Sequence, residues 1–198
     1  MQPSSPLPWL RRLVVTLACA AAWSMPAGAH QQHAHTHGRL SLDVAMDAQS
    51  ITLLIESPLD SFLGFERAPR NDNERQRVAQ LVAQWNAADQ LLQPAPAAGC
   101  QLVKAELVSE VLGLGRGHGH GDATKAAVNQ HQPDADGHGD ISIEVVFTCT
   151  KTDAASHLDI KLFDVYKRLK HIDAQVASPQ GQFKRSLSPG AARLNLLR

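Results

Sequence analysis

Histidine is concentrated in two short stretches of the chain, so the chemistry of imidazole is the first to consider. The first stretch, residues 30–38, reads HQQHAHTHG, and the second, residues 113–140, reads GLGRGHGHGDATKAAVNQHQPDADGHGD. We call them the first and the second His tract. Together they hold eight of the ten histidines: His30, His33, His35, His37, His118, His120, His131 and His138.

Imidazoles at this spacing indicate metal binding. Neutral imidazole binds Zn, Cu, Ni and Co, and zinc in proteins takes four ligands, commonly His with Asp or Glu. A pair such as His118 and His120 places two imidazoles within reach of one ion. Asp122 and Asp140 supply carboxylates that complete such a shell. Because ordering a flexible loop opposes binding, the expected sites are adaptable and of moderate affinity.

Other functions are compatible with histidine-rich segments. The tracts are alternatively solvated polar loops whose histidines have no function. His157 and His171 lie outside the tracts and are expected to be ordinary surface or core residues. An enzyme is a further alternative, but a catalytic metal needs three fixed ligands, an open position and a positioned base. No G-x-S-x-G or H-E-x-x-H motif is present. We therefore expect a binding protein and not an enzyme.

The N-terminus has the features of an export signal. Arg11 and Arg12 precede a short apolar run over 13–23, and Ala27-Gly28-Ala29 is typical of a cleavage site. The sequence therefore predicts a cleaved signal peptide over 1–29, with His30 as the first mature residue. An uncleaved membrane anchor is the alternative, but the apolar run is short for a membrane span. We expect residues 30–38 to be a flexible tract and 39–198 to be one domain.

Export changes the interpretation of the cysteines. Only Cys100 and Cys149 remain after loss of the signal peptide, and two cysteines in an oxidising compartment most often pair. A thiolate zinc site is the alternative, but neither cysteine has a neighbour in C-x-x-C spacing. The predicted disulfide encloses the second His tract. The formal net charge of zero implies neither nucleic acid nor a membrane surface as a partner.

Hydrophobic patterning predicts the elements that must position the tracts. Alternation indicates strands over 39–46, 51–55, 100–112, 141–149, 158–162, 172–176 and 183–187. A short helix is expected to begin at Ser57-Pro58, and a longer one at Asn71, where Glu74 completes a capping box. Trp85 follows helical spacing and is expected in the core. A further short helix is expected over 163–169, with Asp164 and Tyr166 on its surface.

These elements predict an α+β fold of antiparallel strands with few helices. Our preferred form is a ferredoxin-like two-layer scaffold that carries a long disordered His-rich loop over 113–140.

Several segments resemble a known family. They are HTHGRLSLDVAMD, IESPLDSFLGFERAP, AAGC, FTC, LDIKLFDVY and SPQGQ, and they occur in this order along the chain. In this they resemble the ZrgA family of zinc-regulated periplasmic proteins. The resemblance implies a periplasmic location, a ferredoxin-like scaffold, and His-rich segments that bind Zn(II).

The resulting hypothesis is a periplasmic protein that captures or buffers Zn(II) and passes it to the solute-binding protein of a zinc ABC importer. The alternatives are a copper or nickel scavenger, or a structural or interaction module that binds no metal.

Overall fold

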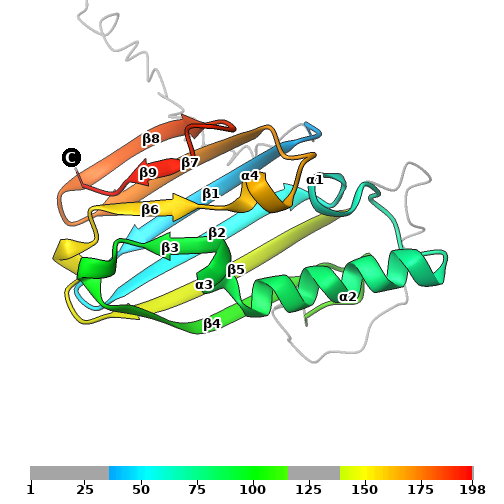
Figure 1. Ribbon diagram of the computed structural model, residues 1–198, viewed down its shortest axis with the longest axis horizontal. Helices are drawn as coiled ribbons and strands as arrows, with labels where there is room; N and C mark the ends of the chain where they lie inside the picture. The colour runs from blue at the N-terminus through cyan, green and yellow to red at the C-terminus, as the bar shows by residue number, and fades with distance from the viewer. Residues whose placement is uncertain (1–35, 116–138, 198) are drawn as a thin grey trace, which may run out of the picture. The chain divides into compact units, whose positions relative to one another are not determined.

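The fold is built on a large sheet that contains both parallel and antiparallel strand pairs. In the computed structural model, which describes residues 36–115 and 139–197, its strands lie in the order β4-β5-β2-β1-β7-β8 (Figure 1). Their bounds are Arg39–Met46 for β1, Ser50–Pro58 for β2, Cys100–Val108 for β4, Asp140–Cys149 for β5, His171–Ser178 for β7 and Gly181–Leu187 for β8. In β1, β2, β5 and β7, alternate side chains are buried, as their period of two requires.

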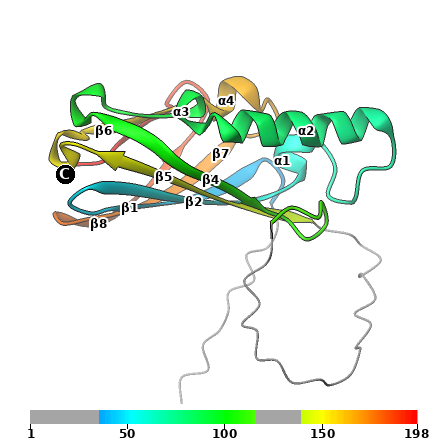
Figure 2. The ribbon, with the colours of Figure 1, turned by 90° about the horizontal axis from the view of Figure 1, so that it is seen from below.

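A second layer covers one face of this sheet. Figure 2 shows α2, α3, α4 and β6 on the same side of the large sheet. The layer contains α1 Asp60–Leu63, α2 Asp72–Asn86, α3 Ala88–Leu91, α4 Leu162–Val165, β3 Leu92–Pro94, β6 His157–Ile160 and β9 Arg193–Asn195, with short 3₁₀ turns over Pro96–Ala98 and Thr152–Ala154. The three short strands form an antiparallel sheet in the order β3-β6-β9. Side chains of both layers meet in one hydrophobic core.

The predicted α+β class is confirmed, but the sheet is mixed and not purely antiparallel. β1 pairs in parallel with β7, whereas the other pairs of the large sheet are antiparallel. The predicted ferredoxin-like arrangement is not confirmed. The parallel pair joins strands that lie far apart along the chain, and local alternation carries no information about which strands pair.

Local signals predicted the long helix well. The side chain of Asn71 caps α2 by accepting a hydrogen bond from the Glu74 backbone N–H at 2.9 Å. Trp85 is fully buried, as helical spacing predicted. Its ring stacks on Tyr166 at 6.5 Å and meets the edge of Phe62 at 6.0 Å, so the aromatic cluster joins α1, α2 and the end of α4.

Two predictions about short segments were wrong. Ser57 and Pro58 lie at the end of β2, opposite Ile141 and Asp140, and α1 begins only at Asp60. A strand end tolerates proline, so the sheet extends to this point before the helix starts. Tyr166 is buried and not on the surface. Its hydroxyl donates to Gln84 Oε1 at 2.9 Å, and burial raises the pKa of that hydroxyl.

The predicted disulfide is present. Cys100 at the start of β4 lies opposite Cys149 at the end of β5, and the two sulfurs are bonded. The bridge closes the open end of the β4–β5 pair, at the far end of these strands from the second tract. Within 36–115 and 139–197, no helix is long and apolar enough to cross a membrane.

Candidate metal-binding site

The structure places only part of the predicted ligand set. His37 and Asp140 lie in the described residues, at the end of the first tract and of the second. The other predicted ligands lie outside the described residues: His30, His33, His35, His118, His120, Asp122, His131 and His138. The site is therefore built here from the described ends of the two tracts.

The sheet topology brings these two ends to the same place. The first tract leads into β1 and the second into β5, and both strands run antiparallel to β2, which lies between them. The starts of β1 and β5 must therefore lie beside the end of β2. Two hydrogen bonds show this: Leu59 N donates to Gly139 O at 2.9 Å, and Ser57 Oγ donates to Arg39 O at 3.3 Å.

Gly139 holds the second tract close to the segment that follows β2. A Cβ atom at this position would lie 2.6 Å from the backbone oxygen of Glu66. Only glycine permits so close an approach without displacement of the backbone. The end of the second tract is therefore fixed against the same segment, 59–66, that faces His37.

His37 contacts two carboxylates in this segment. Its Nδ1 lies 3.1 Å from Asp60 Oδ2 and 3.8 Å from Glu66 Oε1. The side chains of Asp60 and Glu66 are only 10% and 8% exposed, whereas that of His37 is 59% exposed. The imidazole therefore stands at the surface, with its inner edge against buried acid groups.

Arg168 fixes the Asp60 carboxylate from the other side. Its Nη2 donates to Asp60 Oδ1 at 2.7 Å, and its Nε donates to the backbone oxygen of Asp60 at 3.0 Å. Partial burial disfavours the charged carboxylate. The hydrogen bonds from His37 and Arg168 outweigh that effect, and the pKa of Asp60 lies below its ordinary value. Asp60 is therefore ionised at neutral pH and held between two donors.

This geometry selects one tautomer of His37. An ionised carboxylate only accepts hydrogen bonds, so Nδ1 carries the proton. The lone pair of neutral His37 is then on Nε2, the ring nitrogen that does not contact Asp60 or Glu66. A histidine that binds a metal typically donates its other N–H to a carboxylate, which orients the ring and makes it more basic. The contact between His37 and Asp60 has the form of such a pair, with Nε2 as the nitrogen that would bind a metal.

The described residues do not form a closed metal site. Across 36–115 and 139–197, no three His, Cys, Asp or Glu side chains are arranged to hold a metal ion. Asp140, a predicted ligand, lies opposite Pro58 at the start of β5 and joins no such group. This corner supplies one anchored imidazole, and further ligands must come from elsewhere.

Sequence reasoning missed Asp60 and Glu66. Both lie in the segment IESPLDSFLGFERAP, far along the chain from His37, and no spacing rule links them to it. The available signal was the position of Asp60 and Glu66 close to the apolar residues Phe62, Leu63 and Phe65, because a buried carboxylate needs a partner. That signal does not name the partner.

We expect that D60N weakens zinc binding about tenfold, because loss of a carboxylate behind a ligating histidine typically has an effect of this size. Competition with a chromophoric chelator at pH 7.5 measures the change. D153N, which alters an exposed carboxylate in the 3₁₀ turn Thr152–Ala154, is the matched control and should bind zinc as the wild type does. Unchanged zinc affinity in D60N would mean that Asp60 does not orient a ligand.

Two comparisons with known proteins were informative about the family of this chain. No curated protein matches the sequence significantly. The sequence model of the ZrgA family zinc uptake proteins matches residues 34–196, which include His37, Asp60, Glu66 and Arg168. The match extends over nearly all of the predicted domain, so the chain belongs to the ZrgA family of zinc uptake proteins.

Proposed function

We propose that this protein is exported to the periplasm, captures or buffers Zn(II) there, and passes it to the solute-binding protein of a zinc ABC importer. The observation that carries the proposal is that the described ends of both tracts, at His37 and Gly139, contact the segment 59–66, which holds Asp60 and Glu66. Membership of a zinc uptake family supports zinc as the cargo. The predicted signal peptide over 1–29 supports export.

In this proposal His37 provides the fixed ligand. Its Nε2 binds the ion while Asp60 holds Nδ1, and histidines of the two tracts complete the shell with Asp122 and Asp140. The remaining proposed tract ligands are His30, His33, His35, His118, His120, His131 and His138. Because the described ends of both tracts contact the same segment, 59–66, this shell requires no change in the sheet.

The same arrangement favours release of the ion. Ligands that must be ordered on binding lower the affinity, because their conformational entropy is lost. The guanidinium of Arg168 also binds Asp60 and places a positive charge near the ion. We therefore propose a site that a more rigid acceptor can empty, and a role in binding and not in catalysis.

Transfer of metal between purified proteins tests this function. The zinc-loaded protein is mixed with the zinc-free solute-binding protein of the importer from the same cell, the two are separated, and the metal in each is measured. We expect most of the zinc to move to the solute-binding protein. Transfer of copper or nickel but not zinc would show that zinc is not the metal that the protein delivers. If no metal is transferred, the protein only buffers the metal and does not deliver it.

A growth experiment tests the same role in cells. A strain that lacks the protein should grow poorly only under zinc chelation, and added zinc should restore growth. Normal growth of this strain under chelation would contradict a role in zinc uptake.

A further inference from the structure

Four basic side chains, on α2 and on the segment that follows α4, line two cavities, one of which also contains His37. They are Arg77, Lys167, Arg168 and Lys170, and we call them the basic patch. Arg77 and Arg168 line a cavity of about 290 Å³ between α1, α2 and the end of α4. Arg168, Lys167 and Lys170 line a second cavity of about 350 Å³, which also contains His37 and Asp60. Arg168 is common to both, so the cavities adjoin.

Most of the charge in the basic patch is not neutralised by carboxylates. In the part of the chain that the structure describes, Arg168 pairs with Asp60, whereas Arg77 has no ion-pair partner. The ammonium groups of Lys167 and Lys170 donate to backbone oxygens, at 3.5 Å and 2.8 Å, and not to acids. Because the whole chain has a formal charge of zero, this is a local excess of positive charge.

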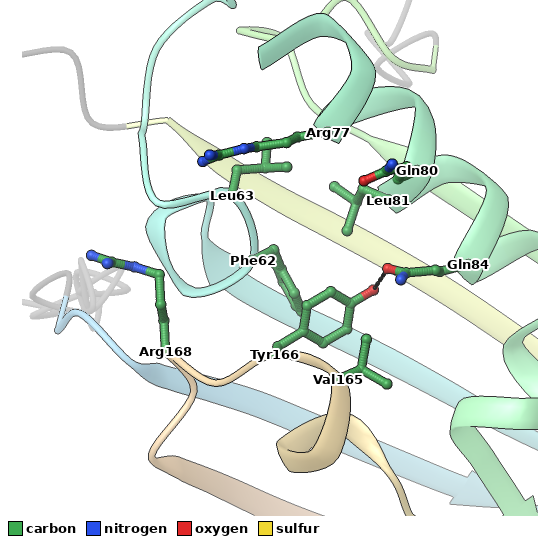
Figure 3. Close-up of a pocket in the computed structure, with 9 residues that line it drawn as sticks. All are labelled: Phe62, Leu63, Arg77, Gln80, Leu81, Gln84, Val165, Tyr166 and Arg168. Atoms are coloured by element: carbon green, nitrogen blue, oxygen red, sulfur yellow. Dashed lines mark hydrogen bonds between the residues drawn. The ribbon is translucent and has the colours of Figure 1, made fainter. Parts of the chain in front are cut away.

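The first cavity combines this charge with an apolar floor. Figure 3 shows Phe62 and Tyr166 between α1 and α2, and their rings meet edge to face at 4.7 Å. The Tyr166 hydroxyl is already bonded to Gln84, and the guanidinium groups of Arg77 and Arg168 lie toward the other side of the view. Val165, which is 40% exposed, also lines the cavity.

Such a cavity fits one acidic side chain. A guanidinium binds a carboxylate through paired N–H donors, and the methylenes of Glu fit against the aromatic floor. Cavities that enclose small ligands have volumes of roughly 300–1,000 Å³, so this one is at the lower limit for a separate molecule. Tyr and Arg beside an exposed apolar residue are instead typical of the energetic centre of a protein interface.

We propose that the basic patch docks an acidic segment of the protein that receives zinc, with a Glu or Asp side chain between Arg77 and Arg168. The identity of the partner as the zinc acceptor rests on the function proposed above. Because Arg168 also holds Asp60, a partner bound here lies beside His37, where the ion is to be handed over. Charge complementarity of this kind accelerates association and is weakened by salt.

A labelled peptide tests the docking independently of zinc. The probe is a capped heptapeptide of alternating Glu and Leu, and binding to the zinc-free protein is followed by fluorescence polarisation in about 20 mM salt, where electrostatic screening is weak. R77E and K184E change the net charge equally, but Lys184 lies on strand β8 and lines neither of the two cavities. We expect R77E to weaken binding at least tenfold and K184E less than twofold.

Several results would overturn the proposal. They are equal losses in the two variants, equal binding of a peptide with Gln in place of Glu, or no binding at millimolar peptide. Arg77 is exposed and makes no ion pair, so R77E should fold, and a circular dichroism spectrum checks this. If R77E does not fold, the double variant K167Q/K170Q replaces it. Binding of the protein to phosphatidylglycerol vesicles but not to the peptide would also overturn docking of a protein.

The transfer assay separates this proposal from the function on which it rests. R77E should retain the zinc stoichiometry of the wild type but pass zinc at least tenfold more slowly, whereas K184E should transfer normally. Normal transfer by R77E would contradict the docking site and leave the proposed function intact. If the wild type itself passes no zinc, the proposed function fails, while the peptide result still decides whether the patch binds acidic segments.

Discussion

Replacement of the eight tract histidines by glutamine should abolish zinc retention and leave the fold nearly unchanged. The variant changes His30, His33, His35, His37, His118, His120, His131 and His138. We expect at least a hundredfold loss of zinc affinity, because each imidazole removed takes away a ligand. We expect a melting temperature within about 2 °C of the wild type without metal, because exposed substitutions usually have little effect on stability.

The structure gives a reason for the unchanged fold and a matched control. Within the described residues, the hydrophobic core contains none of the histidines to be changed. The side chain of His37 is largely exposed. The control replaces His157 and His171, the two histidines outside the tracts, and should retain the full zinc stoichiometry. Zinc content after dialysis and thermal unfolding measure the two effects. Full zinc retention, or global unfolding, in the tract variant would contradict the proposed site.

Among the variants considered, removal of the disulfide should cause the largest decrease in the free energy of unfolding. Cys100 and Cys149 are 49 residues apart, and the chain-entropy model gives roughly 4 kcal/mol for a closed loop of this length. The bridge restricts the unfolded chain, so its removal stabilises the unfolded state. We expect C100A/C149A to lower the free energy of unfolding by about this amount, as measured by urea denaturation with linear extrapolation.

The zinc stoichiometry of the same variant should not change. The tract end at Gly139 is held by the hydrogen bond between Leu59 N and Gly139 O and by the nearby end of the β4–β5 pairing, where Val108 lies opposite Ser142. Both contacts lie at the other end of the strands from the bridge. A loss of stability below about 1 kcal/mol would show that the unfolded chain is not restricted as the loop length predicts. Loss of zinc together with the disulfide would indicate that the bridge helps to place the tracts.

The sequence by itself determined the features that depend on local physics. Alternation of apolar residues predicted β1, β5 and β7, because side chains of a strand point to opposite faces in turn. The cap of α2 at Asn71 was predictable because the hydrogen bond joins neighbouring residues. The disulfide followed from the number of cysteines left after removal of the predicted signal peptide, and the metal hypothesis from the density of imidazoles.

Only the tertiary structure showed that His37 contacts buried carboxylates. The parallel pairing of β1 with β7 and the position of β2 between β1 and β5 depend on contacts between distant segments, which alternation does not encode. That topology puts the ends of both tracts beside Asp60, and it brings Arg168 from the far half of the chain to hold the carboxylate. Residue types led to a hypothesis about which side chains bind metal, but the orientation of His37 comes from partners that only folding brings within hydrogen-bond distance.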